Sequence, residues 1–244
     1  MQSKLCIYAS ISYLCGQEYK KSTGMKVVNM SETPSVLNQY VSELRDVQIQ
    51  QDRMRFRRNL ERIGEMMAFE ISKDLSYKEA TVRTPLAECK CQRLSEEIVL
   101  ATIFRAGLPF HQGFLNVFDH AENGFVSAFR YYKDKECSKV GVNVEYMASP
   151  DLTGKTLIIV DPMLAKGYSL ELGLVALLKN GRPRRAILVS VIASEEGVEH
   201  IRQSFGEYEE VELWCAAIDP VLDERSYIVP GLGDAGDLAY GNKM

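Results

Sequence analysis

The sequence predicts an α/β fold with a mostly parallel sheet flanked by helices, a small β-hairpin arm and helices near the N-terminus. From Glu97 onward, apolar strand patterns alternate with helical patterns, which is typical of a parallel sheet with crossover helices. Residues 157–160 are a run of apolar side chains, as in a strand buried on both faces. The 244 residues are 46% hydrophobic, which is enough to bury one substantial core.

The N-terminal half is expected to be helical. We predict one domain over residues 31–244, preceded by an extension over residues 1–30 that is either an over-long start or a disordered segment. Residues 34–44 predict a short amphipathic helix with Ser35 as its N-cap. Apolar residues at helical spacing predict a longer helix over residues 52–75. Its arginines at positions 53, 55, 57 and 58 either meet a phosphate-bearing effector or a subunit, or form a solvated face, which we favour.

The later elements follow in chain order. Residues 80–86 and 89–94 alternate in a way that indicates a β-hairpin arm over residues 80–95, joined near Pro85. Beyond it, strands are expected at residues 98–104, 125–129, 157–160, 186–193 and 211–218, and helices near residues 109–118, 169–179 and 198–205. A glycine-rich loop over residues 227–237 follows the last strand.

Composition and charge argue against several classes of protein. Twenty-nine Lys and Arg against thirty-three Asp and Glu leave a net charge of −4, which does not favour a nucleic-acid partner held by bulk positive charge. The six cysteines show no C-x-x-C spacing and only three histidines accompany them, so we expect no metal site and reduced thiols in a cytoplasmic protein. No apolar run is long enough to cross a membrane, and residues 5–16 lack a small-residue cleavage site.

Residues 157–169, LIIVDPMLAKGYS, have the layout of a phosphate-binding loop. An apolar strand runs into Asp161 and then into a short glycine-containing loop that opens a helix. Unpaired backbone N–H groups at a helix N-terminus attract an anion, and Gly167 allows the backbone to approach it closely. Asp161 is placed to accept from ribose hydroxyls. Alone, the pattern is ambiguous, because many doubly wound proteins have the same strand, turn and helix without a ligand there.

Several segments resemble the uracil phosphoribosyltransferase family, and they occur along the chain in the same order as in that family. They are DPMLAKGYS at residues 161–169, FRAGL at 104–108, FR at 129–130, AAIDP at 216–220 and YIVPGLGDAGD at 227–237. The last is the most specific, because packing alone would not select so many glycines and prolines. The resemblance covers residues 34–243 and implies a phosphoribosyltransferase-like fold.

The resemblance also implies an activity. Uracil would react with phosphoribosyl diphosphate (PRPP) to give uridine monophosphate (UMP) and diphosphate, a reaction of pyrimidine salvage. Mg²⁺ would arrive bound to the diphosphate of PRPP, with no metal cage in the protein. The family further implies a homodimer or higher homo-oligomer, formed with help from the arm, and GTP as a candidate activator.

Candidate site residues follow from the matched segments. Arg105 and Arg130 each follow a predicted strand, which would bring both guanidiniums to the carboxyl edge of the sheet as phosphate ligands. With Asp161 they are the catalytic candidates. The PRPP candidates are Arg105, Arg130, Asp161, Pro162, Met163, Leu164, Ala165, Lys166, Gly167, Tyr168, Ser169 and Asp234. The uracil candidates are Tyr227, Ile228, Gly233, Asp234 and Ala235. Ser169 is either a phosphate ligand through its hydroxyl or the N-cap of the helix, and both roles are compatible.

Three positions depart from the family pattern. Lys166 stands where the family has threonine, Tyr168 where a small residue is common, and Leu238 where arginine is common. The first two replace a hydroxyl and add bulk at residues 161–169, the predicted phosphate loop. The resemblance therefore predicts an active uracil phosphoribosyltransferase, with two alternatives: a weak paralogue that binds PRPP or UMP as a sensor, and a transferase for another base. The intact YIVPGLGDAG segment argues against the last.

Overall fold

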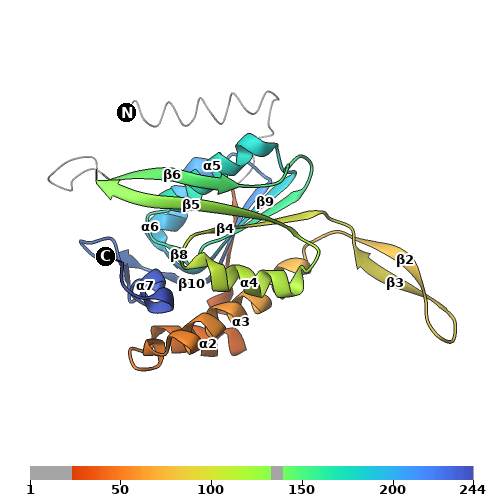
Figure 1. The fold of residues 1–244 in the computed structure, drawn as a ribbon, viewed down its shortest axis with the longest axis horizontal. Helices are drawn as coiled ribbons and strands as arrows, with labels where there is room; N and C mark the ends of the chain where they lie inside the picture. Colours follow the sequence, from red (N-terminus) through yellow and green to blue (C-terminus); the bar gives the residue numbers. More distant parts are fainter. Residues whose placement is uncertain (1–23, 133–139, 244) are drawn as a thin grey trace.

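The computed structural model describes residues 24–132 and 140–243, and their centre is an eight-stranded sheet (Figure 1). Its strands lie in the order β1 (Lys26–Asn29), β10 (Val211–Asp219), β9 (Arg185–Ser194), β7 (Thr156–Val160), β4 (Ile98–Ile103), β5 (Glu122–Tyr132) and β6 (Val140–Ala148), with the short β8 (Met163–Leu164) paired to the end of β9. Neighbouring strands are parallel except β5 and β6, which are antiparallel. The predicted mostly parallel sheet is confirmed.

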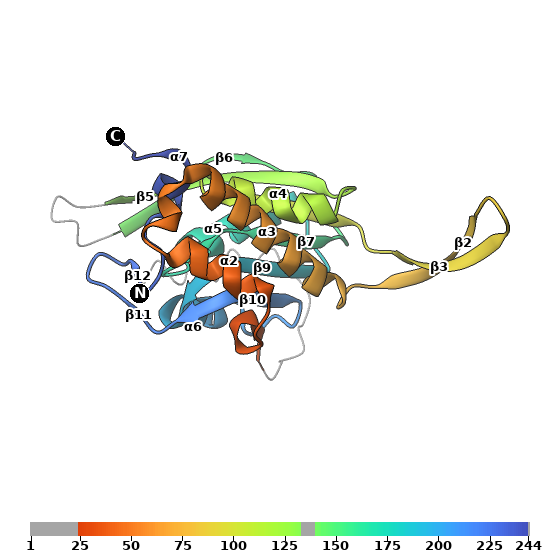
Figure 2. The ribbon, with the colours of Figure 1, turned by 90° about the horizontal axis from the view of Figure 1, so that it is seen from below.

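Helices cover both faces of this sheet. Helices α2 (Val36–Arg45), α3 (Arg53–Ser72) and α4 (Gly107–Val117) lie on one face, and Figure 2 shows that face from the helix side. Helices α5 (Tyr168–Leu177) and α6 (Glu195–Phe205) lie on the other, and α7 (Ala235–Tyr240) lies near the C-terminus. Single turns of 3₁₀ helix lie at Met30–Glu32, Ile49–Gln51 and Leu178–Asn180. None of the helices in the described ranges is both long and apolar enough to span a bilayer.

Alternate residues of the central strands feed two cores. Ile158 and Val160 of β7 pack in the core under α2, α3 and α4, whereas Leu157 and Ile159 pack in the core under α5 and α6. Because successive side chains of a strand point to opposite faces, a strand buried on both sides must be apolar throughout. All five residues of β7 are buried, which explains the uninterrupted apolar run in the sequence.

The N-terminal helices begin where the sequence predicts. Ser35 caps α2 in a capping box with Asn38, and Asp52 caps α3 by accepting from two backbone N–H groups.

The basic run of α3 binds other parts of this chain. Arg55 forms two 2.9 Å hydrogen bonds with Glu43, and Arg57 donates to the Ala239 carbonyl. Hydrogen bonds from Arg55 and Asn59 lower the pKa of Glu43 to about 2.

Two strands were not anticipated from the sequence. β6 pairs antiparallel with β5, which extends beyond the predicted residues 125–129. β1 pairs with β10, so residues 26–29, assigned above to the extension, are part of the sheet. Residues 1–23 lie outside the described chain. A strand of four residues at a sheet edge, with one half-buried face, has too short a pattern to be recognised without its partner.

The predicted arm is a two-stranded hairpin that projects away from the body of the molecule (Figures 1 and 2). β2 (Tyr77–Arg83) and β3 (Glu88–Leu94) pair in register from Tyr77 opposite Leu94 to Arg83 opposite Glu88. Cys89 and Cys91 lie on this arm as free thiols, and Cys215 is a free thiol in the core, where burial raises its pKa far above the usual range.

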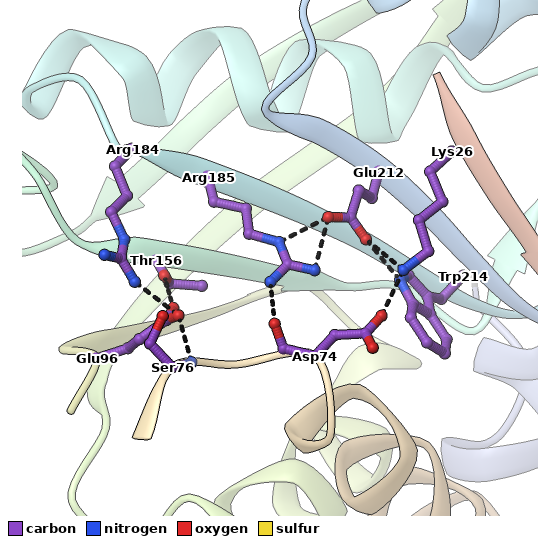
Figure 3. A network of polar contacts seen from close by, with 9 residues as sticks. All are labelled: Lys26, Asp74, Ser76, Glu96, Thr156, Arg184, Arg185, Glu212 and Trp214. Carbon is purple, nitrogen blue, oxygen red and sulfur yellow. Dashed lines mark hydrogen bonds and ion pairs between the residues drawn. The ribbon is translucent and has the colours of Figure 1, made fainter. Parts of the chain in front are cut away.

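A network of polar contacts joins the base of the arm to the starts of the sheet strands (Figure 3). Glu96 accepts from Arg184 at 2.6 Å, from the Ser76 backbone at 2.7 Å and from the Thr156 hydroxyl. Beside it, Arg185 bonds Glu212 at 2.6 Å and the carbonyl of Asp74 at 2.9 Å. Lys26 and Trp214 complete the network at the β1 side. The arm is therefore anchored at the amino end of the sheet.

Glu96 makes this anchor sensitive to pH. Burial raises the pKa of its carboxyl, but hydrogen bonds from Thr156, Arg184 and Ser76 outweigh that effect and lower the pKa to about 2 from 4.5. A carboxyl whose folded-state pKa is depressed stabilises the fold above its unfolded pKa and loses this contribution as the pH falls through the folded value. The contribution of Glu96 is thus complete at neutral pH and disappears between about pH 4.5 and pH 2.

We predict that Glu96→Gln lowers the free energy of unfolding at pH 7 by about 1–2 kcal/mol, a range reduced for solvent screening of the half-exposed Arg184. The difference from the natural chain should shrink as the pH falls toward 2, because the natural carboxyl becomes protonated. Urea titrations at a series of pH values measure this. Glu88→Gln, on the exposed arm, is the matched control and should change little. A difference that stays constant with pH would contradict the explanation.

Candidate functional site

A cleft of about 640 Å³ opens at the carboxyl edge of the sheet. The parallel strands β4 and β7 both end there, at Ile103 and Val160, so the chain segments that follow them meet at this edge. The segment after β4 brings Arg105, and the segment after β7 brings Asp161. The C-terminal loop supplies the remaining wall with residues of the 226–236 segment.

The cleft gathers candidates from three distant parts of the sequence. The predicted site residues that line it are Arg105, Asp161, Met163, Ala165, Ser169, Tyr227, Ile228, Gly233, Asp234 and Ala235. The others from the phosphate loop, Pro162, Leu164, Lys166, Gly167 and Tyr168, are not among its lining residues. Pro162, Leu164 and Gly167 are buried, Lys166 is half-buried, and Tyr168 is 40% exposed.

The phosphate loop is held against the end of β9. Met163 and Leu164 pair with Ile192 and Ala193 as β8, so the two residues after Asp161–Pro162 continue the sheet for one short step. The Asp161 carboxylate accepts from the Met163 backbone N–H at 3.3 Å. This pairing holds the start of the loop in place before the chain turns into α5.

Gly167, rather than Ser169, is the N-cap of α5. Its φ of 82° lies in the left-handed region that glycine adopts readily, and no side chain caps the helix. Ser169 is the second residue of the helix and lines the cleft, so the N-cap alternative for its hydroxyl is wrong. An uncapped first turn leaves backbone N–H groups available to an anion at the cleft.

Arg105 is bound to the C-terminal segment. Its Nη2 donates to the Asp237 carboxylate at 2.7 Å and its Nη1 to the Gly241 carbonyl at 3.3 Å, while its buried Nε has no hydrogen-bond partner. Asp237 is itself held by Asp234, whose side chain accepts from the Asp237 backbone N–H at 3.0 Å. Because 37% of the Arg105 side chain is exposed and the residue lines the cleft, the guanidinium lies within reach of a ligand there.

The position of Arg130 corrects one prediction. β5 continues through Tyr132, so Arg130 lies within a strand and does not follow one. β5 pairs with β4 only as far as Val126, whereas its pairing with β6 runs from Phe125 to Tyr132 and places Arg130 opposite Val142. Partnership with β6 and the β-forming Tyr131 and Tyr132 explain the longer strand. The side chain of Arg130 lies outside the part of the chain that the structure describes.

The C-terminal loop is fixed by a buried carboxylate. Asp219, the last residue of β10, forms two 2.8 Å bonds with Arg45 and accepts from the Gly231 backbone N–H at 2.8 Å. Arg45 also donates to the Gly231 carbonyl at 3.0 Å. Between these anchors, β11 (Val221–Leu222) and β12 (Ile228–Val229) pair as a short hairpin. Ile228 is thereby brought to the cleft with only 4% of its surface exposed.

Sequence reasoning missed several lining residues, namely Ile103, Phe104, Ala106, Ser127, Ser226, Gly236 and Lys243. Phe104, Ala106 and Gly236 belong to the matched FRAGL and YIVPGLGDAGD segments, so extending the candidates to whole segments would have found them. Ser127 and Lys243 carry no such pattern. Lys243 lies 3.5 Å from the Asp234 carboxylate, a contact that only the folded chain brings about.

Comparisons with known proteins agree with this geometry. The family model described as uracil phosphoribosyltransferase matches residues 30–242. A uracil phosphoribosyltransferase from Porphyromonas gingivalis is 55% identical over 220 residues, which cover 90% of this chain and all of the relative. One from Pyrococcus furiosus is 36% identical and covers 89% of this chain and 91% of its own.

One solved structure is similar to this chain over most of its length. The AQ2163 protein from Aquifex aeolicus superposes with a TM-score of 0.77 at 33% identity, over 88% of this chain and 98% of that one. The family match thus spans the sheet, both sets of helices and the loops that form the cleft. The chain belongs to the uracil phosphoribosyltransferase family, a family of pentosyl-transferring enzymes.

Proposed function

We propose that this chain transfers the phosphoribosyl group of PRPP to uracil in pyrimidine salvage. A ring nitrogen of uracil bonds to the anomeric carbon and loses its proton, the bond from that carbon to the diphosphate oxygen breaks, and UMP and diphosphate leave. The observation that carries the proposal is the single cleft of about 640 Å³ shared by Arg105, the phosphate loop and the C-terminal loop. It provides room for a phosphate group, a pentose and a base beside one another.

The roles of the residues follow from where charge lies during the reaction. Arg105 neutralises charge that develops on the leaving diphosphate, and the family resemblance assigns the same role to Arg130. The first turn of α5, with Ser169, receives the 5-phosphate, and Asp161 accepts from the ribose hydroxyls. The base-binding loop is residues 227–237, where Ile228 covers the ring and the backbone around Gly233 matches its donors and acceptors.

The donor set also fits a Mg²⁺ ion that arrives with PRPP. Mg²⁺ keeps several waters and takes one or two carboxylates together with phosphate oxygens. Asp161 and Asp234 both line the cleft and would hold it. Among the described residues, no cluster of three or more His, Cys, Asp or Glu side chains forms a separate metal site. When bound, Mg²⁺ supplies charge neutralisation to the diphosphate.

Further properties are proposed from the family resemblance. We propose that the chain works in the cytoplasm as a homodimer or higher homo-oligomer, with β1 and residues 31–244 together as one phosphoribosyltransferase domain and the arm at a subunit contact. GTP is the candidate activator. Because a two-stranded hairpin standing alone is only marginally stable, an exposed arm of this length favours a partner surface.

The alternative of a binding paralogue that senses PRPP or UMP is not favoured. Lys166 and Tyr168 suggest this alternative, because two bulky side chains in the phosphate site would obstruct it. Neither lines the cleft, so the departures from the family pattern do not block it. The YIVPGLGDAG segment also carries the loop that would bind uracil in preference to another base.

We predict that the natural chain forms UMP from uracil and PRPP in the presence of Mg²⁺, with one diphosphate released per UMP. Lys166→Thr, which restores the family residue, should change kcat/KM for PRPP by less than about tenfold, because Lys166 lies outside the cleft. Chromatographic measurement of UMP tests this, with a panel of other bases as specificity controls. Absence of UMP formation by both proteins would refute the proposed function, and activity of the variant alone would support the sensor.

A second prediction concerns Arg105. Arg105→Gln should reduce kcat/KM for PRPP by about a hundredfold or more, because it removes a cation from the position where diphosphate charge develops. Steady-state kinetics at varied PRPP give this value. The matched control is Arg182→Gln, which removes an exposed arginine that pairs with Glu210 and lies before the start of β9, at the opposite edge of the sheet from the cleft. Equal losses in the two variants would show that the effect of Arg105 is not local.

A further inference from the structure

Helix α6 supports the phosphate loop from the side away from the cleft. His200 Nε2 lies 2.8 Å from the Glu171 Oε2 atom, and Ser204 donates to the other carboxylate oxygen at 3.0 Å. Because an ionised carboxylate only accepts, Nε2 carries the hydrogen in this arrangement. Glu171 lies in the first turn of α5 and is buried, so both of its oxygens are held by α6.

The same histidine contacts the loop itself. The Tyr168 ring packs edge-on against His200, with ring centroids 4.7 Å apart at 76°. A Cβ atom built on Gly167 would lie 2.8 Å from His200 Cδ2, so the loop backbone runs directly beside the imidazole. Tyr168 therefore packs on α6, which explains how a large side chain is accommodated next to the phosphate loop.

The start of α6 is equally close to the loop. Ser194, the N-cap of α6, donates to the Ala165 carbonyl at 2.6 Å. A Cβ atom on Gly197 would lie 2.3 Å from the same carbonyl oxygen, so only glycine permits this approach. At Ala165 and Gly167, the loop between β8 and α5 thus lies against the first two turns of α6.

We propose that His200 is a positioning residue for the PRPP site, acting through Glu171 and Tyr168. The inference rests on the proposed function, because it assigns the first turn of α5 to a phosphate group. A helix N-terminus binds an anion best when its N–H groups are fixed in advance, since an unordered loop must be ordered at the expense of binding energy.

Two effects of His200 contribute to positioning the phosphate loop. Its contact with Gly167 and Tyr168 limits the motion of the loop at the residue that begins the helix. Its hydrogen bond holds the Glu171 carboxylate toward α6. A carboxylate left unpaired in the first turn would compete with a phosphate for the same positive end of the helix. In this chain, the contact between Tyr168 and His200 supports the loop. A small residue at position 168 would not form this contact.

The test compares His200→Ala, His200→Gln and the natural chain by steady-state kinetics. His200→Ala should raise KM for PRPP about tenfold, with KM for uracil changed less than about twofold, because only the phosphate loop loses its support. Gln retains an amide donor for Glu171, so His200→Gln should recover most of the PRPP affinity. The matched control is His120→Ala, a histidine with 99% of its side chain exposed, which should behave as the natural chain.

The outcomes separate this inference from the proposed function. If the natural chain forms UMP and His200→Ala lowers kcat without raising KM for PRPP, or raises both KM values equally, the positioning role is wrong and the function stands. If the natural chain forms no UMP but binds PRPP, calorimetry should still show weaker PRPP binding by His200→Ala. Should His200→Ala fail to fold, Tyr168→Ala, at a residue with 40% of its surface exposed, should raise KM for PRPP in the same direction, and an unchanged value would overturn the inference.

Discussion

The ion pair between Arg45 and Asp219 is the interaction on which the site depends. Asp219 ends β10 and is buried, so its charge requires compensation, and Arg45 at the end of α2 supplies it with two 2.8 Å bonds. Both residues also bond the backbone of Gly231. A helix from the start of the chain, the sheet edge and the C-terminal loop are thereby joined at one point, and the base-binding loop is brought over the ends of β4 and β7.

The two ends of the sheet differ in their polar contacts. At the amino end, Glu96, Glu212 and their arginine partners join strand starts to the arm, where they contribute to stability (Figure 3). At the carboxyl end, Arg105 lines the cleft and retains a buried Nε without a partner. Unsatisfied polar groups destabilise a fold unless a ligand completes them, which is why they concentrate where substrates bind.

Much of the fold could be predicted because local chemistry and tertiary structure agree. Ser35 and Asp52 begin helices by capping them, and residues 157–160 are apolar because both faces of β7 are buried. β6 and the extension of β5 could not be predicted, because their existence depends on pairing with each other. The orientation of Tyr168 is also set by a distant partner, His200, so the sequence indicated an obstruction of the phosphate site where the fold places a supporting contact. The resemblance identified the loops, whereas only the fold showed which of their residues share a cleft.

In the proposed reaction one cleft holds both substrates side by side, and UMP binding provides the most direct test of this arrangement. UMP contains the 5-phosphate, the ribose and the base, so it should occupy the parts of the cleft used by PRPP and by uracil together. Competition calorimetry with the full chain measures this. We expect one UMP site per chain, from which PRPP displaces UMP competitively. Simultaneous, independent binding of UMP and PRPP to the same chain would contradict it.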